Sequence, residues 1–116
     1  IMLLTFVAKK VRRMIVVFDK DYLRELYVTG KCDRKHRFQP EIVNRYKRRI
    51  DYLKQAKNVE ELFRLPSLRY EVLQGGKKGI SSIRVNDQYR IEFVVNQDNE
   101  PFLSVCDILE LSNHYK

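Results

Sequence analysis

The sequence predicts an α+β fold in which N-terminal helices pack on one face of an antiparallel sheet. Apolar residues recur every three or four positions through residues 42–56, a spacing that marks the buried stripe of a helix. Residues 89–96 instead alternate largely between apolar and polar types, which is the period of a half-buried strand. Short polar or glycine-rich turns separate the strand-like segments of the second half, and short turns force antiparallel pairing. Helices followed by such strands form a layered α+β domain.

Length and composition favour one globular domain. The chain has 116 residues, of which 44% are hydrophobic and 33% charged, an ordinary balance for a folded protein. Cys32 and Cys106 lie far apart without metal-ligand spacing, which excludes a zinc ribbon, a zinc finger and a thiol-redox motif. We therefore expect no metal and no cofactor, and a reducing, cytoplasmic environment. No run of 18 apolar residues occurs, so we expect no membrane association.

Residues 1–13 are set apart by their pattern, an apolar run followed by four basic residues. A secretory signal has the opposite order, with charge before the apolar run. We predict that 1–13 are an upstream extension or arm outside the fold, and that 14–116 form the single domain. Of the net charge of +8, this segment supplies four positive charges, so residues 14–116 carry nineteen basic against fifteen acidic side chains, a net charge of +4. That surplus only weakly indicates phosphate-bearing partners.

The first half of the predicted domain is a short strand followed by helices. Asp19 is a candidate N-cap, and Gly30 stands where a glycine would end the helix that follows. Pro40 fits the first turn of the next helix. Asn58 with Glu61 resembles a capping box for a short third helix. The predicted elements are a strand at 15–18, a helix between Asp19 and Gly30, a basic loop at 31–38, and helices at 40–56 and 59–64.

The second half consists of strands joined by turns. Three of the four glycines of the chain fall within 75–79, which is a strong turn signal. Strands are expected at 68–74, 80–86, 89–96 and 102–109. Alternation then directs Ile83 and Ile91 into the core and places Arg84 and Arg90 on a common open face.

A basic open face is the predicted site of chemistry. Arg84 and Arg90 would share it with lysines of the glycine-rich turn, and the tail that follows the last strand carries His114 and Tyr115. A concave face with arginine, lysine, histidine and tyrosine but few carboxylates suits a phosphodiester. With RNA, a base can activate the 2′-hydroxyl for attack on the neighbouring phosphate, an acid can protonate the departing 5′-oxygen, and cations can stabilise the developing charge.

Each of these residues also has a plainer structural interpretation. Strand arginines are often only solubilising, turn lysines are often ordinary hairpin residues, and a histidine near a terminus is often incidental. His36, in the basic loop, is more simply a surface residue than a catalytic one. Glu71 is either the cross-strand partner of an arginine or a proton acceptor. Composition alone does not decide between these interpretations.

The order of residues from Leu65 to Phe93 adds a family resemblance. The segments Leu68-Arg69, Gly75 to Gly79, Ser82-Ile83-Arg84-Val85-Asn86 and Tyr89-Arg90-Ile91 resemble the HigB branch of the RelE/ParE toxin superfamily, whose members belong to bacterial toxin–antitoxin pairs. The resemblance covers residues 14–116 and implies a RelE-like, microbial-ribonuclease-like fold. It implies a type II toxin that cuts mRNA in the ribosomal A site and so inhibits translation.

The resemblance also implies partners and site residues. The partners are the ribosome with its A-site mRNA and a HigA-like helix-turn-helix antitoxin, through which alone operator DNA is bound. Many relatives have histidine at the place of Glu71 and end in Asp-Tyr-His where this chain has Asn113-His114-Tyr115, so the acid and base roles stay open. The candidate catalytic residues are Arg84, Arg90, His114, Tyr115 and Glu71, and the candidate RNA-binding residues are Arg69, Lys77, Lys78, Asn86 and Lys116.

Two other functions remain open at this point. ParE-like members of the same superfamily inhibit DNA gyrase instead of cutting RNA, and His114 with the glycine-lysine turn argues only weakly for the nuclease. The third hypothesis is a non-catalytic module whose basic surface binds RNA or an acidic antitoxin.

Overall fold

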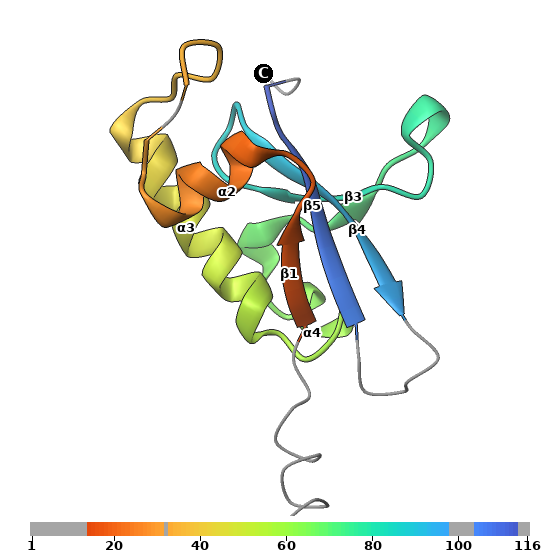
Figure 1. Ribbon diagram of the computed structural model, residues 1–116. Helices are drawn as coiled ribbons and strands as arrows, with labels where there is room; N and C mark the ends of the chain where they lie inside the picture. The colour runs from red at the N-terminus through yellow and green to blue at the C-terminus, as the bar shows by residue number, and fades with distance from the viewer. Residues whose placement is uncertain (1–13, 32, 98–103, 114–116) are drawn as a thin grey trace, which may run out of the picture.

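The computed structural model describes residues 14–31, 33–97 and 104–113. One five-stranded sheet, with the order β1-β5-β4-β3-β2, forms its framework. Helices α2 (Asp21–Val28) and α3 (Pro40–Gln55) lie together on one side of this sheet (Figure 1). This is the α+β architecture with helices on one face that the sequence predicts.

The sheet is mixed, which corrects the expectation of a wholly antiparallel one. Strands β2 (Glu71–Val72), β3 (Ser81–Arg84), β4 (Arg90–Gln97) and β5 (Ser104–Ser112) pair antiparallel in succession. The first strand, β1 (Met14–Phe18), pairs parallel to β5, with Val16 opposite Cys106. Parallel strands need a long connection, and the helices and strands between β1 and β5 provide one, so that both strands run in the same direction.

Helix α3 is the element that the sequence predicts most closely. Pro40 occupies its first turn, and the buried residues Ile42, Val43, Tyr46, Ile50 and Leu53 follow the predicted stripe. The hydroxyl of Tyr46 donates a hydrogen bond of 2.8 Å to the carbonyl of Leu23, which ties α3 to α2. The backbone N–H of Met14 donates to the carbonyl of Ala56 at 2.9 Å, so the end of α3 fixes the start of β1.

Helix α2 ends as expected but begins differently. Gly30 has φ +77°, the left-handed conformation that a glycine readily adopts beyond a helix end. The predicted N-cap, Asp19, is wrong, because the cap is Lys20, which makes no side-chain capping bond. The N–H of Asp19 instead donates to the carbonyl of Ile108 at 2.8 Å and thereby continues the pairing of β1 with β5. Strand pairing therefore displaces the helix start by one residue.

The segment that leads to β2 also differs from its prediction. The sequence predicts a strand over 68–74, but residues Pro66–Leu68 form a 3₁₀ turn and β2 spans only Glu71–Val72. Arg69, between them, has φ 46° and ψ 52°, the left-handed region. The short helix α4 (Glu60–Phe63) precedes this segment, and the N–H of Glu61 donates to Asn58 Oδ1 at 3.2 Å, which is one half of the predicted capping box. The other half differs, because Glu61 Oε1 accepts from the N–H of Lys57, at 2.9 Å, in place of that of Asn58.

The core lies between the helices and the sheet. Ile83 on β3, Ile91 and Phe93 on β4, and Ile108 on β5 are fully buried and face α2 and α3. Alternate residues of the same strands therefore face away from the helices, onto the other side of the sheet. Within the part of the chain that the structure describes, no helix has the length and apolar character needed to cross a membrane.

Candidate active site

The face of the sheet opposite the helices carries the two strand arginines. Arg84 is the last residue of β3 and Arg90 is the first residue of β4, and the two are direct partners in the pairing of these strands. Direct partners in an antiparallel pair point to the same side of a sheet. Since Ile83 and Ile91, the next pair, are buried in the core, Arg84 and Arg90 share the face opposite the helices. We call this side of the sheet the open face, although Arg90 itself is buried there. The predicted juxtaposition of these two residues agrees with the register.

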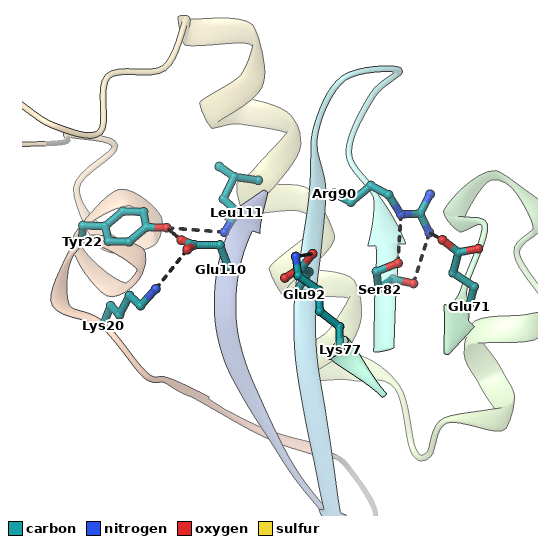
Figure 2. Close-up of polar contacts among 9 residues, drawn as sticks. All are labelled: Lys20, Tyr22, Glu71, Lys77, Ser82, Arg90, Glu92, Glu110 and Leu111. Carbon is teal, nitrogen blue, oxygen red and sulfur yellow. Dashed lines mark hydrogen bonds and ion pairs between the residues drawn. The ribbon is translucent and has the colours of Figure 1, made fainter. Parts of the chain in front are cut away.

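Arg90 is fixed from several directions, and its side chain is only 9% exposed. Its Nε donates to Ser82 Oγ at 2.9 Å, and its Nη2 donates to the carbonyls of Ser82, at 3.4 Å, and of Arg69. Nη2 also lies 3.6 Å from Glu71 Oε1. Figure 2 shows the guanidinium between Ser82 on β3 and Glu71 on β2. A guanidinium held in this way has one orientation before any ligand arrives.

The left-handed backbone at Arg69 belongs to this arrangement. Residues other than glycine rarely adopt this backbone conformation, which costs them about 1 kcal/mol or more. The carbonyl of Arg69 accepts a hydrogen bond from Arg90 Nη2, so the local strain is offset by a charge-assisted contact. The side chain of Arg69 is exposed, and its candidate role in RNA binding stays a prediction.

Arg84 is held much more loosely than Arg90. Its side chain is 25% exposed, and its Nη2 binds Asp87 Oδ1, on a side chain that is 96% exposed. The hydrogen bond and the charge of Arg84 hold the pKa of Asp87 below its ordinary value. An exposed ion pair is weak because water screens it. A phosphate can therefore replace Asp87 as the partner of Arg84 at little cost.

Carboxylates on the open face contradict the expectation that it is poor in them. The register places Glu110, Glu92, Ser82 and Glu71 in one row across β5, β4, β3 and β2. Glu71 lies beside Arg90, so of its two interpretations the cross-strand ion pair is present in the structure. The sequence could not place Glu92 beside Glu110, because a bulge between Glu92 and Phe93 shifts the register with β5.

Two of these carboxylates form ion pairs with lysines that lie outside the strands, Glu92 with Lys77 and Glu110 with Lys20. Lys77, in the glycine-rich turn, places its Nζ 2.8 Å from Glu92 Oε2. The Glu92 side chain is 5% exposed and that of Lys77 is 41% exposed, so the ion pair reaches from the protein interior to solvent. Lys78 is exposed. Of the two turn lysines, Lys77 thus has a structural partner, and the RNA-binding role of both remains a prediction.

Asn86 shapes the turn between β3 and β4. Its Oδ1 accepts hydrogen bonds from the backbone N–H groups of Gln88, at 2.9 Å, and Tyr89, at 2.7 Å. This is the local turn that asparagine side chains favour. The carboxamide oxygen therefore has a structural task, whatever contact Asn86 makes with RNA.

The tail residues His114, Tyr115 and Lys116 lie outside the described residues. The described part of β5 ends with Ser112, which is the register partner of Arg90. The strand that precedes the tail thus ends beside the arginine pair, and the roles of the three residues stay predictions.

A cavity of about 380 Å³ lies at the end of β5, and the sequence did not indicate it. Its wall includes Tyr22 from α2 and His36 from the basic loop, whose rings stack with centroids 3.7 Å apart and planes at 5°. His36 Nδ1 lies 2.9 Å from Asp33 Oδ1, and this hydrogen bond lowers the pKa of Asp33. The interpretation of His36 as a plain surface residue is therefore incomplete, since the side chain is partly buried and packed.

Tyr22 connects this cavity to the carboxylate row. Its hydroxyl donates to Glu110 Oε1, while Lys20 Nζ lies 3.0 Å from Glu110 Oε2, as Figure 2 shows. Burial, and then the hydrogen bond to Glu110, raise the pKa of Tyr22 far above its ordinary value, so it stays protonated. Partial burial acts to raise the pKa of Glu110, but the bonds from Tyr22 and Lys20 outweigh it and the pKa is lowered.

No group of three or more histidine, cysteine, aspartate or glutamate side chains in the described ranges is arranged to hold a metal ion. The chemistry that the described residues offer is cationic binding by Arg84 and Arg90, with carboxylates close by. Such a set can bind a phosphodiester and stabilise added negative charge on it.

Comparisons of the sequence and the fold with known proteins identify the family of this chain. A family model described as the RelE-like toxin of type II toxin–antitoxin system HigB matches residues 16–104. Toxin HigB-1 from Vibrio cholerae serotype O1 is 37% identical over 81 residues, which are 69% of this chain and 82% of that protein. The solved structure of a YoeB/ParE toxin from Agrobacterium tumefaciens has a TM-score of 0.51 and 17% identity, and the match covers 88% of this chain and 100% of the other. That structural likeness supports the fold.

Proposed function

The chain belongs to the RelE-like HigB toxins of type II toxin–antitoxin systems, which inhibit translation by cleaving mRNA, and we propose that it cuts mRNA in the ribosomal A site. The substrate is then a single-stranded stretch of mRNA presented by the ribosome, and Arg84 and Arg90 hold the phosphate that is cut. The register that brings these two arginines to one open face is the observation that carries this proposal.

The reaction that suits this face is attack by the RNA on itself. The 2′-oxygen loses its proton to a base and bonds to the adjacent phosphorus, and the bond from phosphorus to the 5′-oxygen breaks as an acid protonates that oxygen. The products are a 2′,3′-cyclic phosphate and a free 5′-hydroxyl. The pentacoordinate transition state carries extra negative charge, and guanidinium groups stabilise it by charge and by paired hydrogen bonds.

The two arginines have different tasks in this proposal. Arg90, locked by Ser82 and the Arg69 carbonyl, keeps a fixed position for the developing charge. Arg84, whose described ion-pair partner is the exposed Asp87, binds the incoming phosphate by exchanging that partner. A rigid and an adaptable cation on neighbouring strands together provide both orientation and capture.

Proton transfer is assigned to the tail and to Glu71. His114 and Tyr115 follow Asn113 in the sequence, two and three residues after Ser112, the last residue of β5 and the register partner of Arg90. Glu71 is a candidate because its Oε1 lies 3.6 Å from Arg90 Nη2. Which of the three is acid and which is base is decided by the pH dependence of cleavage in the respective variants.

Partners and domain limits complete the proposal. As a type II toxin the chain has a cognate antitoxin. We propose that this antitoxin is HigA-like, with a helix-turn-helix domain through which the pair binds its operator. We also propose that 14–116 form the toxin domain and 1–13 an extension, which is supported by the start of the family match at residue 16.

The test is translation in vitro with purified protein, followed by mapping of mRNA 5′ ends. The wild type should produce cuts in phase with codons, and Arg84→Ala should reduce them about 100-fold. Arg48→Ala is the matched control, because it removes the same charge from the exposed side of α3, on the opposite face of the sheet. It should cut like the wild type.

Two results would contradict the proposal. One is undiminished cutting by Arg84→Ala. The other is intact mRNA together with inhibition in a gyrase supercoiling assay, which would select the ParE-like activity instead.

A further inference from the structure

A second cavity adjoins the one at the end of β5. It measures about 300 Å³ and is lined by the turn after β3, the start of α3 and Arg37. Arg37 and Tyr89 line both cavities, so the two lie on either side of these residues. Each volume is in the range of small-ligand sites, which start at about 300 Å³. Neither cavity has a part in the cleavage chemistry proposed above.

Four aromatic side chains line the larger cavity. Tyr22 stacks on His36, and Phe38 meets Tyr89 edge to face with centroids 5.5 Å apart. Each ring is positioned by its neighbour and by the core, since Tyr22 is buried and Phe38 and Tyr89 pack against the core cluster. Fixed aromatic faces are what proteins use to stack the unpaired bases of single-stranded RNA.

Two basic side chains also line this cavity. Lys35 and Arg37 are exposed, and neither has an ion-pair partner in the described ranges. The acidic group of the wall, Glu110, is already engaged by Lys20 and Tyr22. The local balance therefore favours a ligand that carries negative charge as well as an aromatic ring.

Polar groups with hydrogen-bonding capacity complete the wall. Ser112 lines the cavity, and its buried Oγ has no hydrogen-bond partner among the described residues. A buried hydroxyl without a partner costs free energy, which a ligand with a polar edge relieves. Asn113, the next residue, is exposed at the same wall.

The cavity is next to the arginine pair along the sheet. Ser112 is the register partner of Arg90, and Tyr89 precedes Arg90 in the chain. An RNA strand whose phosphate rests on Arg84 and Arg90 therefore passes the end of the sheet where the cavity opens.

From these observations we infer that the cavity between the basic loop and the end of β5 binds one nucleotide of the mRNA next to the cut, with the base against the aromatic wall and the phosphate at Arg37. The inference rests on the proposed RNA cleavage and deepens it, because this contact selects the base beside the cut. His36 and Arg37 are the specificity-determining residues, and Arg84 and Arg90 act on whichever phosphate the selected base brings into place.

The first experiment measures binding without cleavage. Isotope-labelled toxin is titrated with a short single-stranded RNA whose 2′-positions are methylated, so that it cannot be cut, and amide signals are followed by NMR. Signals of residues 35–38, Tyr89 and Ser112 should shift. Arg37→Ala should weaken binding about tenfold, the size expected for a lost charged contact. Arg34→Ala is the matched control, since Arg34 is an exposed arginine of the same loop that lines neither cavity.

The second experiment reads the sequence at the cut sites. On translating ribosomes the wild type and Arg34→Ala should share one base preference beside the cut. His36→Ala and Arg37→Ala should still cut, but with that preference flattened at least about threefold. His36→Ala keeps the fold if its thermal unfolding matches the wild type, and Arg37→Ala, at an exposed position, serves where it does not.

Each outcome decides the inference separately from the proposed function. If the wild type cuts and both variants keep its base preference, the inference is overturned while RNA cleavage stands. If the methylated RNA shifts the signals of Arg84 and Arg90 but none at the cavity, the inference is likewise overturned. If the wild type cuts no mRNA, the proposed function fails, and the titration alone shows whether the cavity takes a nucleotide.

Discussion

Arg84 and Arg90 are neighbours of the same chemical type, yet their surroundings differ. Arg90 is nearly buried, with donors fixed by Ser82 and the Arg69 carbonyl and an ion pair to Glu71. Arg84 is partly exposed and binds Asp87, a residue of its own turn. One strand pair thus supplies two cations with different properties: Arg90 supports the fold, and Arg84 is accessible to a ligand. Substitutions should therefore separate stability from activity.

The largest effect is expected for Arg90→Ala, which should lower both the rate of cleavage and the free energy of unfolding. Loss of a fixed transition-state cation reduces cleavage by about 100- to 1000-fold. Loss of its buried hydrogen bonds should reduce the free energy of unfolding by about 3 kcal/mol. Single-turnover cleavage and denaturant unfolding measure the two effects. Full stability in Arg90→Ala would show that the buried contacts do not support the fold.

Arg84→Ala should lower cleavage alone. We expect a loss of about 100-fold in rate, with the free energy of unfolding within about 0.5 kcal/mol of the wild type. The reason is that its partner, Asp87, is exposed and the ion pair is screened by water. The same two measurements apply, and a matching loss of stability would remove the contrast with Arg90.

The glycine-rich turn sharpens the comparison through two adjacent lysines. Lys77→Ala removes the ammonium partner of the buried Glu92 and should reduce the free energy of unfolding by about 1–2 kcal/mol. Lys78→Ala, its exposed neighbour, should change that free energy by less than about 0.5 kcal/mol. Thermal or urea unfolding of the pair is the measurement. Equal effects would mean that the Lys77–Glu92 ion pair contributes nothing specific.

The smallest effect is a pH-dependent one at Tyr22. The pKa of Glu110 is held below its ordinary value of 4.5, so this carboxylate stabilises the fold above that pH and loses its contribution as the pH falls through the lower, folded-state pKa. Tyr22→Phe removes the hydrogen bond to Glu110, which is one of the causes of the lowered pKa. The substitution should reduce the free energy of unfolding by about 1 kcal/mol at neutral pH, and this difference in stability from the wild type should shrink below pH 4.5. A difference in stability that stays constant from neutral to acidic pH would exclude the role of this hydrogen bond.

Local patterns were sufficient for much of the fold. Helix α3 follows from its apolar spacing and Pro40, and the open-face placement of Arg84 and Arg90 follows from alternation plus a short turn. Where long-range contacts decide, prediction from the sequence fails. Arg69 takes a left-handed backbone beside Arg90, which shortens β2, and nothing in the local sequence indicates that contact.

The candidate site was predictable to the same degree. The arginines were found because they lie on one hairpin. The carboxylate row depends on the bulge in the pairing of β4 with β5, and the stack of His36 on Tyr22 joins two segments with no shared pattern. Distances along the chain do not carry this information, because it arises only when α2 and the basic loop pack at the end of β5.

In the proposed mechanism, Arg84 and Arg90 act on the same phosphate. A double-mutant cycle of Arg84→Lys and Arg90→Lys, read as single-turnover cleavage on ribosomes carrying one defined mRNA, tests it most directly. We expect that each variant cuts slowly and that the two losses are coupled by about 0.5–3 kcal/mol, since both groups bind one charge centre. Losses that simply multiply, or a double variant that cuts at the wild-type rate, would contradict it.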